Sequence, residues 1–445
     1  MITENEKNLA LMALERAKKE GADKARVSLS KSTEDLVSTL DGCVDKVTRC
    51  ADRSLSIALF VDGRFGSFST NKLEADALED FISKAVKAVR MLAPDPCRDL
   101  PDHKRCCTTA ESGKEMGIYD SEYASISPDD RIRTALGASV FGKIETEGYK
   151  IVSEEGEYSD SEYDLFVADT EGLACRHTET NFDYGVEVTI EDGNGDKYSD
   201  YWWTASPSKA GFDASECVRT AIRKAAAQIG SEPAESGKYN MVVCSDIASK
   251  MVSPILNALN AYSIQQGNSF LAGSLGQQVF PEGMTIIDMP HLKGQTGSKL
   301  FDSEGVATKE AAIIEKGVIK QYSVNTYMSH KLGIEPTIED PVRPKVMPWP
   351  REGMKVKDIM EMCGDGILVT EFNGGNSNSA TGDFSYGISG QIFKDGKIVS
   401  PVSEMLVTGN FKDLWSRLVA VGDDSRPCMS KLIPTLAFAK VDFNG

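Results

Sequence analysis

The segment 367–412 constrains the fold most strongly, because apolar strand-forming runs alternate in it with polar and glycine-rich residues. Its first apolar run, 367–369, predicts a β-strand that leads into a loop over 373–379, where every residue is Asn, Gly or Ser. Asp395 and Gly396 stand between two further apolar runs, which is a strong signal for a tight β-hairpin. A glycine-rich polar loop between two strands can present backbone groups to a ligand, but an ordinary surface loop accounts for the same residues equally well.

Alternation of apolar and polar residues predicts strands in the first half of the chain as well. Thr3 followed by Glu6 predicts a capping box, and Ser127 followed by Pro128 predicts a second helix start. Asp62 with Gly63 predicts another hairpin. The expected strands in this half are 25–30, 55–61, 65–68, 145–158, 163–168, 173–178, 182–191 and 197–204.

The order of these elements predicts the domain organisation. Helix, antiparallel strands and helix occur twice before residue 230, which indicates two N-terminal units over residues 1–117 and 118–230. Segment 230–237 is the clearest boundary, and residues 231–445 are expected to form a β-rich C-terminal domain. We therefore expect an α+β fold with antiparallel sheets throughout.

The charge balance excludes several classes of function. The chain has 49 Lys and Arg against 67 Asp and Glu, a net charge of −18, so we expect no direct nucleic-acid binding. No window approaches about 18 uninterrupted apolar residues and the charged N-terminus lacks a signal-peptide core, so we expect no membrane span and a cytoplasmic location. The ten cysteines form no CxxC pair and suit reduced thiols.

The sequence contains no familiar catalytic motif. Its four histidines are too far apart in the chain to share a helical metal motif. They are His103, His177, His291 and His330. Neither a Walker A pattern nor a GxSxG nucleophile elbow occurs. Asp383 with Glu371 or Glu404 could form an acid–base pair, although solvated surface carboxylates are the more common arrangement.

Three short motifs near the C-terminus resemble the TldD/PmbA family, and more closely its PmbA (TldE) branch. They are Thr-Gly-Asp-Phe-Ser-Tyr-Gly at 381–387, Pro-Val at 401–402 and Thr-Gly-Asn at 408–410. The resemblance extends over most of the chain and is strongest from Tyr239 onward. It implies a TldD/PmbA-like fold and a two-subunit cytoplasmic metalloprotease that trims unfolded or ribosomally made peptides.

The resemblance also implies where such a protease holds its metal. In the TldD branch a helix that matches 251–264 carries an HExxxH zinc motif, but this stretch has neither His nor Glu here. That branch takes a further ligand from a cysteine near the C-terminus. Cys428 lies in the matching region, and without two histidines we interpret it as structural or inherited. We therefore expect no catalytic residue and no cofactor in this chain, and zinc in a TldD-type catalytic partner.

Under this interpretation the polar loop and its flank are the candidate site for peptide substrates, because main-chain hydrogen bonds can hold an extended peptide. The candidate residues are Asn376, Thr381, Gly382, Asp383 and Ser385. A homodimer of this chain also remains open. The family's older description as a modulator of DNA gyrase is an alternative, which an acidic chain could fulfil only through protein contacts. An independent hydrolase that uses Asp383 and Ser385 is a third interpretation.

Overall fold

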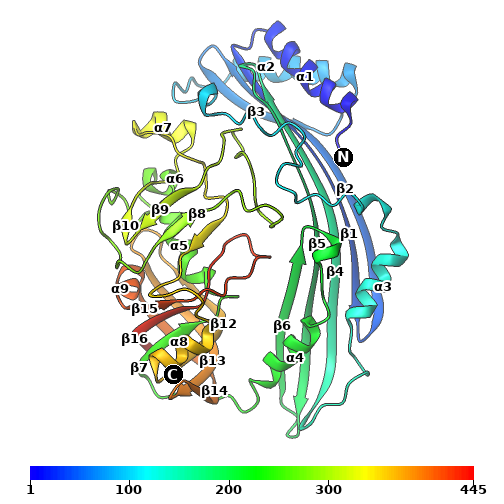
Figure 1. The fold of residues 1–445 in the computed structure, drawn as a ribbon. Coiled ribbons are helices and arrows are strands. Elements are labelled where there is room, and N and C mark those ends of the chain that lie inside the picture. The colour runs from blue at the N-terminus through cyan, green and yellow to red at the C-terminus, as the bar shows by residue number, and fades with distance from the viewer.

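The N-terminal region is built on one six-stranded sheet in the order β3-β2-β1-β4-β5-β6 (Figure 1). The computed structural model describes all residues from 1 to 445. The strands are β1 (Lys24–Leu40), β2 (Cys43–Val61), β3 (Arg64–Thr70), β4 (Tyr149–Asp169), β5 (Ala174–Asp192) and β6 (Lys197–Ser206). All neighbouring strands are antiparallel. The strands of the two expected N-terminal units therefore share a single sheet.

Four helices cover one face of this sheet. They are α1 (Glu4–Lys19), α2 (Ala75–Val89), α3 (Pro128–Ala138) and α4 (Cys217–Ala226). Val27 and Leu29 of β1 belong to the core beneath α1 and α2, and Val37 belongs to the core beneath α3 and α4. Because alternate residues of a strand point to the same side, all four helices lie on one face. The capping box predicted at Thr3 and the helix start predicted at Ser127 are confirmed, and Ser127 also forms a capping box with Asp130.

Two pairs of predicted strands each form one continuous strand in the structure. The sequence predicted separate strands over 145–158 and 163–168, but β4 is continuous from Tyr149 to Asp169. Likewise, the segments 173–178 and 182–191 form the single strand β5. The polar residues that separated these segments in the sequence lie within the continuous strands, and Asp160 among them has a charged partner, Arg131.

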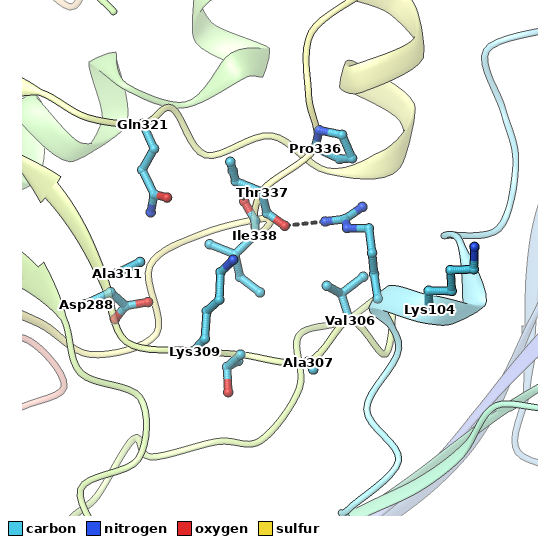
Figure 2. A pocket seen from close by; sticks show the side chains of 12 residues that line it. Lys104, Asp288, Val306, Ala307, Lys309, Ala311, Gln321, Pro336, Thr337 and Ile338 are labelled. Atoms are coloured by element: carbon cyan, nitrogen blue, oxygen red, sulfur yellow. Dashed lines mark hydrogen bonds between the residues drawn. The ribbon is translucent and has the colours of Figure 1, made fainter. Parts of the chain in front are cut away.

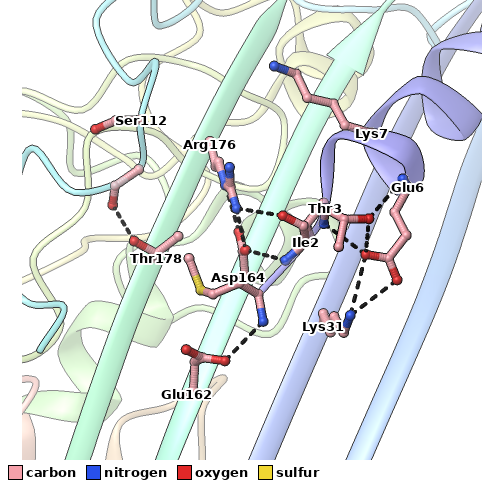
Figure 3. A network of polar contacts seen from close by, with 12 residues as sticks. Ile2, Thr3, Glu6, Lys7, Lys31, Ser112, Glu162, Asp164, Arg176 and Thr178 are labelled. Carbon is pink, nitrogen blue, oxygen red and sulfur yellow. Dashed lines mark hydrogen bonds and ion pairs between the residues drawn. The ribbon is translucent and has the colours of Figure 1, made fainter. Parts of the chain in front are cut away.

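Buried ion pairs stabilise the polar middle of β4. Asp160 is fully buried, and both of its carboxylate oxygens accept hydrogen bonds of 2.8 Å from the Arg131 guanidinium. Figure 3 shows the second pair, in which Arg176 donates to Asp164 at 3.0 and 2.6 Å. The backbone N–H of Ile2 also donates to Asp164, at 2.6 Å. Buried carboxylates with cationic partners are tolerated in a sheet, so β4 continues through its polar stretch.

The C-terminal domain contains a second six-stranded sheet, whose order is β14-β13-β12-β7-β16-β15. Its strands are β7 (Gly237–Val243), β12 (Gly366–Ser377), β13 (Asp383–Lys394), β14 (Lys397–Asn410), β15 (Leu418–Val421) and β16 (Leu436–Asn444). An additional pairing of β14 with β16 closes the sheet into a ring. β7 and β12 are parallel, so the expectation of antiparallel sheets throughout is wrong here. A long crossover between these two strands allows the parallel pairing.

That crossover carries a smaller four-stranded sheet and four of the domain's five helices. The strands are β8 (Ile286–Asp288), β9 (Ala311–Glu315), β10 (Val318–Ile319) and β11 (Pro344–Val346). The helices of the domain are α5 (Ser249–Ala258), α6 (Ala261–Gln265), α7 (Thr326–Leu332), α8 (Val356–Cys363) and α9 (Phe411–Ser416). The hairpin predicted at Asp395 and Gly396 is confirmed between β13 and β14. No helix in the chain has the length and apolar character needed to cross a membrane.

The glycine-rich segment 373–379 is a strand for most of its length, which corrects the loop prediction. β12 continues to Ser377 and pairs with β13, so the turn is confined to 378–382. Gly375 has a φ of +92°, and a Cβ atom on it would lie 2.0 Å from the carbonyl oxygen of Ser385. Glycine at this position therefore permits the close approach of two strands.

The C-terminal domain lies against the sheet face that carries no helix (Figure 1). Val167 of β4 and Phe301 of the crossover share a small apolar core there. In the linker between α2 and α3, the backbone N–H of Cys107 donates to the carbonyl oxygen of Gly305 at 2.9 Å. The contacts therefore include both side chains of the sheet and backbone hydrogen bonds of the linker.

Candidate functional site

The turn between β12 and β13 is held by side-chain hydrogen bonds around Asp383. Thr381 Oγ1 donates to Asp383 Oδ2 at 2.7 Å, and Asn410 Nδ2 donates to Asp383 Oδ1 at 2.9 Å. Asn410 Nδ2 also lies 2.9 Å from the carbonyl oxygen of Thr381. Gly382 has a φ of +82°, and a Cβ atom on it would lie 3.0 Å from the ring of Phe270. The structure thus brings three of the five predicted residues into one turn.

These hydrogen bonds also decide what Asp383 can do. The donors Asn410 and Thr381 lower the pKa of the exposed Asp383 carboxyl below its usual value. The carboxylate is therefore ionised at neutral pH, and each of its oxygens already accepts a hydrogen bond. Asn410 Oδ1 in turn accepts a hydrogen bond from the backbone N–H of Lys412 at 3.0 Å, as the N-cap of α9. Asp383 acts here as a link between the turn and α9.

The other two predicted residues, Asn376 and Ser385, form a separate polar row. They lie opposite each other in the β12–β13 register, and Ser385 lies opposite Thr408 of β14. Asn376 and Ser385 are exposed, and neither side chain makes a hydrogen bond within the chain. Phe384 and Tyr386, which flank Ser385 in β13, point the other way and are buried in the core of the domain. The row therefore faces outward and is free to contact another molecule.

Helix α5 overlaps the stretch that the TldD-type zinc motif would occupy, and its side chains do not fit a zinc ion. It contains no His, Cys, Asp or Glu. Ser253 on this helix accepts a hydrogen bond of 3.2 Å from the ammonium group of Lys431. Nowhere in the chain do three His, Cys, Asp or Glu side chains come together in an arrangement that could hold a metal ion.

Three of the four histidines have separate hydrogen-bond partners in different parts of the molecule. A ring nitrogen of His177 lies 3.0 Å from the Glu179 carboxylate. His291 lies 2.9 Å from the hydroxyl of Thr308. His330 lies 3.0 Å from the carbonyl oxygen of Cys97. Each of these three histidines therefore makes a hydrogen bond to a different neighbour in the fold.

Cys428 lines a cavity of about 370 Å³ between β5 and the C-terminal domain. Asn181 and Asp183 of β5 lie on its wall, together with Thr296. Asn181 Oδ1 and Thr296 Oγ1 are buried without a hydrogen-bond partner. Burial raises the pKa of Asp183, although the Ser159 hydroxyl donates to its carboxylate at 2.7 Å. The cavity is polar enough to take water or a small polar group, but its single thiol is no zinc site.

A larger cavity of about 570 Å³, which was not predicted from the sequence, lies on the same sheet face. Its charged lining residues are all acidic: Asp45, Glu155, Glu157, Asp183 and Glu187. Tyr201 and Trp203 form an aromatic wall. The only signal in the sequence was the density of acidic residues in β4 and β5, because the lining comes from five strands that the register brings together. Such a surface attracts cations and repels anions.

The comparisons with known proteins place the chain in a class of metallopeptidase-related proteins, although its helix α5 offers no metal-ligating side chain. Family models described as PmbA/TldA metallopeptidase match three parts of the chain: domain 1 over residues 25–89, the central domain over 121–229 and the C-terminal domain over 236–445. The chain belongs to the TldD/PmbA family, as its C-terminal motifs indicated.

Individual relatives agree with this assignment. The chain is 29% identical to metalloprotease PmbA of Escherichia coli O157:H7 over 427 residues, which covers 94% of this chain and 92% of that protein. A crystal structure from Bacteroides thetaiotaomicron, described as a candidate modulator of DNA gyrase, has a TM-score of 0.93 at 36% identity and full coverage of both chains. TldE from Thermococcus kodakarensis shares the fold, with a TM-score of 0.84 at 18% identity over 98% of this chain and all of that one.

Proposed function

We propose that this chain is the non-catalytic, PmbA/TldE-type subunit of a cytoplasmic metalloprotease that processes peptides, with zinc carried by a TldD-type partner. The observation that carries the proposal is the pairing of Ser253 on α5 with the ammonium group of Lys431. A fixed positive charge beside this helix repels a divalent cation, and the helix offers no ligand to offset that repulsion. The chain then contributes surface to the assembly and leaves the chemistry to its partner.

The outward row of Asn376 and Ser385 is the surface that we assign to the peptide. Their free side chains lie on a sheet face next to backbone groups of the 378–382 turn. Extended peptides bind to such surfaces through main-chain hydrogen bonds and pockets for alternate side chains. Thr381, Gly382 and Asp383 would shape this surface and need not touch the peptide themselves.

Reconstitution with a TldD-type subunit tests the proposal. We expect one complex that contains both chains, zinc bound to the TldD-type partner, and peptide cleavage only when both chains are present. The variant Lys431→Ala serves as a control, since removing the ammonium group alone supplies no ligand and should leave this chain free of zinc. Peptide cleavage by this chain alone would overturn the proposal.

A role as a modulator of DNA gyrase is the second candidate, because the similar structure from Bacteroides thetaiotaomicron is described in those terms. The net charge of −18 favours protein contacts over contacts with DNA. Purification of the native complex from cells separates the two candidates: recovery with a metalloprotease subunit supports the first, and recovery with gyrase supports the second. Sedimentation over a wide range of dilution would show whether the chain also forms a homodimer.

A hydrolytic site at Asp383 and Ser385 is the third candidate, and no geometry supports it. Asp383 is bonded to Thr381 and Asn410, and the Ser385 hydroxyl has no hydrogen-bond partner that could act as a base. A nucleophilic serine requires such a base within hydrogen-bond reach.

A further inference from the structure

The linker between α2 and α3 meets the C-terminal domain around a cavity of about 330 Å³ (Figure 2). Lys104 and Arg105 of the linker lie on one side of it. Backbone hydrogen bonds of 2.9 Å fix this side in place: Cys107 N–H donates to the Gly305 carbonyl, and Ala307 N–H donates to the Arg105 carbonyl. The cavity is therefore formed by two parts of the chain that are held rigidly together.

The cavity concentrates positive charge in a strongly acidic chain. Lys104, Arg105 and Lys309 line it, against Asp288 as the one acidic residue. None of the three basic side chains forms a salt bridge, although the net charge of the chain is −18. Asp288 is 2% exposed and its carboxylate accepts hydrogen bonds from the backbone N–H groups of residues 342 and 343, so it belongs to the wall.

Several donors in the cavity have no acceptor. The Arg105 guanidinium makes a single hydrogen bond, to the carbonyl oxygen of Thr337, and its remaining N–H groups have no partner. The Lys309 ammonium group and the Gln321 side-chain amide make no hydrogen bond within the chain. Figure 2 shows Lys309 extending towards Ile338 and Gln321, whereas Lys104 lies at the edge. A ligand with acceptor oxygens would satisfy these donors.

Part of the remaining wall is apolar, and the volume of the cavity limits the size of the ligand. Val306, Ala307, Ala311 and Ile338 supply hydrophobic surface beside the donors. Ligand sites in proteins start at about 300 Å³, so this cavity suits a molecule of about the size of a dipeptide. Phosphate alone would use the positive charge and leave the apolar wall uncovered.

We propose that this cavity is a binding site for a small carboxylate with an apolar body, held by Arg105 and Lys309. The planar fork of Arg105 matches a carboxylate, and Lys309 adds a second positive charge. The two sources of this chemistry are the C-terminal end of a short apolar peptide and a free aliphatic acid. The site is separate from the 378–382 turn and does not depend on the role of the chain in a protease.

Isothermal titration calorimetry on the full chain, with three probes at constant ionic strength, tests the proposal. The probes are N-acetyl-leucyl-leucine, its C-terminal amide and hexanoate. We expect the peptide acid to bind at least about tenfold more tightly than the amide, because each charge-assisted hydrogen bond contributes at this level. Tighter binding of the peptide acid than of hexanoate assigns the site to peptide ends, and equal binding assigns it to aliphatic acids in general.

The variants identify the residues. Lys309→Gln should weaken binding of the peptide acid about tenfold without changing the melting temperature, because the side chain is exposed and makes no bond in the free protein. Arg105→Gln should weaken it at least as much. Lys320→Gln is the matched control, since Lys320 pairs with Glu315 outside the cavity and its loss should leave binding unchanged. Equal binding of acid and amide, unchanged binding by Lys309→Gln, or no binding of any probe would overturn the proposal.

Discussion

The side-chain amide of Asn410 donates a hydrogen bond of 2.9 Å to the carboxylate of Asp383, and thereby ties the end of β14 to the start of β13. Both residues belong to the motifs that resemble the TldD/PmbA family. Their contact gives these motifs a structural meaning, because the same amide caps α9 through Lys412. The motif residues therefore hold a turn, a strand end and a helix start in one arrangement.

Asp383→Ala should lower the melting temperature by about 2 °C, because the variant loses two hydrogen bonds that brace the turn. Ser385→Ala is the matched control, since its hydroxyl has no partner and its loss should leave the melting temperature unchanged. Thermal unfolding of both variants measures the difference. The peptide-cleaving activity of the reconstituted pair should fall with Ser385→Ala if the polar row touches substrate. An Asp383→Ala protein of unchanged melting temperature would show that the brace is unimportant.

Zinc should be absent from the isolated chain at stoichiometric levels. The reason is the lack of any three-donor cluster and the lysine beside α5. Elemental analysis of protein purified without chelators measures the metal content, and Cys428→Ser should not change it. One zinc per chain that disappears in Cys428→Ser would contradict this account.

Gly375→Ala should destabilise the chain by about 2–4 kcal/mol, because its Cβ would lie 2.0 Å from the Ser385 carbonyl oxygen at a φ of +92°. Gly267→Ala separates the cost of a positive φ from the cost of the close contact with a backbone oxygen. Gly267 has a φ of +74° with no atom within 4 Å, so that variant should lose only about 1 kcal/mol. Urea denaturation measures the free energy of unfolding of both variants. An equal loss in the two would mean that β12 and β13 do not approach closely at Gly375.

The pH dependence of stability should carry a contribution from Asp302. Burial, and then the charge of Glu304, raise the pKa of Asp302 to about 6. The folded chain therefore binds this proton more tightly than the unfolded chain, and the contribution stabilises the fold as the pH falls from about 7 towards 4. The full effect is at most about 3 kcal/mol.

Asp302→Asn removes this titration while keeping an oxygen acceptor for the backbone N–H groups of Glu304 and Val306. The difference in free energy of unfolding between the variant and the native chain should therefore shift in favour of the variant as the pH rises from 5 to 7. Urea denaturation at several pH values measures it. Parallel stability curves for the two proteins would contradict the assignment to Asp302.

Local signals in the sequence were sufficient for several elements. The helix starts at Thr3 and Ser127 and the hairpin at Asp395 and Gly396 each depend on residues close together in the chain. The missing HExxxH motif was likewise visible without a structure, because such ligands share one helix. The resemblance of the C-terminal motifs was enough to indicate the family.

Contacts between distant residues required the tertiary structure. From the sequence, a strand was predicted to end at the polar middle of β4, because the sequence does not show that Arg131 reaches Asp160. The glycine-rich segment was predicted to be a loop. Only the pairing of β12 with β13 shows why position 375 is glycine, since a side chain there would meet the backbone of Ser385. The cavity around Lys309 gave no signal, since its partner Arg105 lies far away in the chain. Local preferences act over a few residues, whereas burial and charge pairing depend on which segments the complete fold brings together.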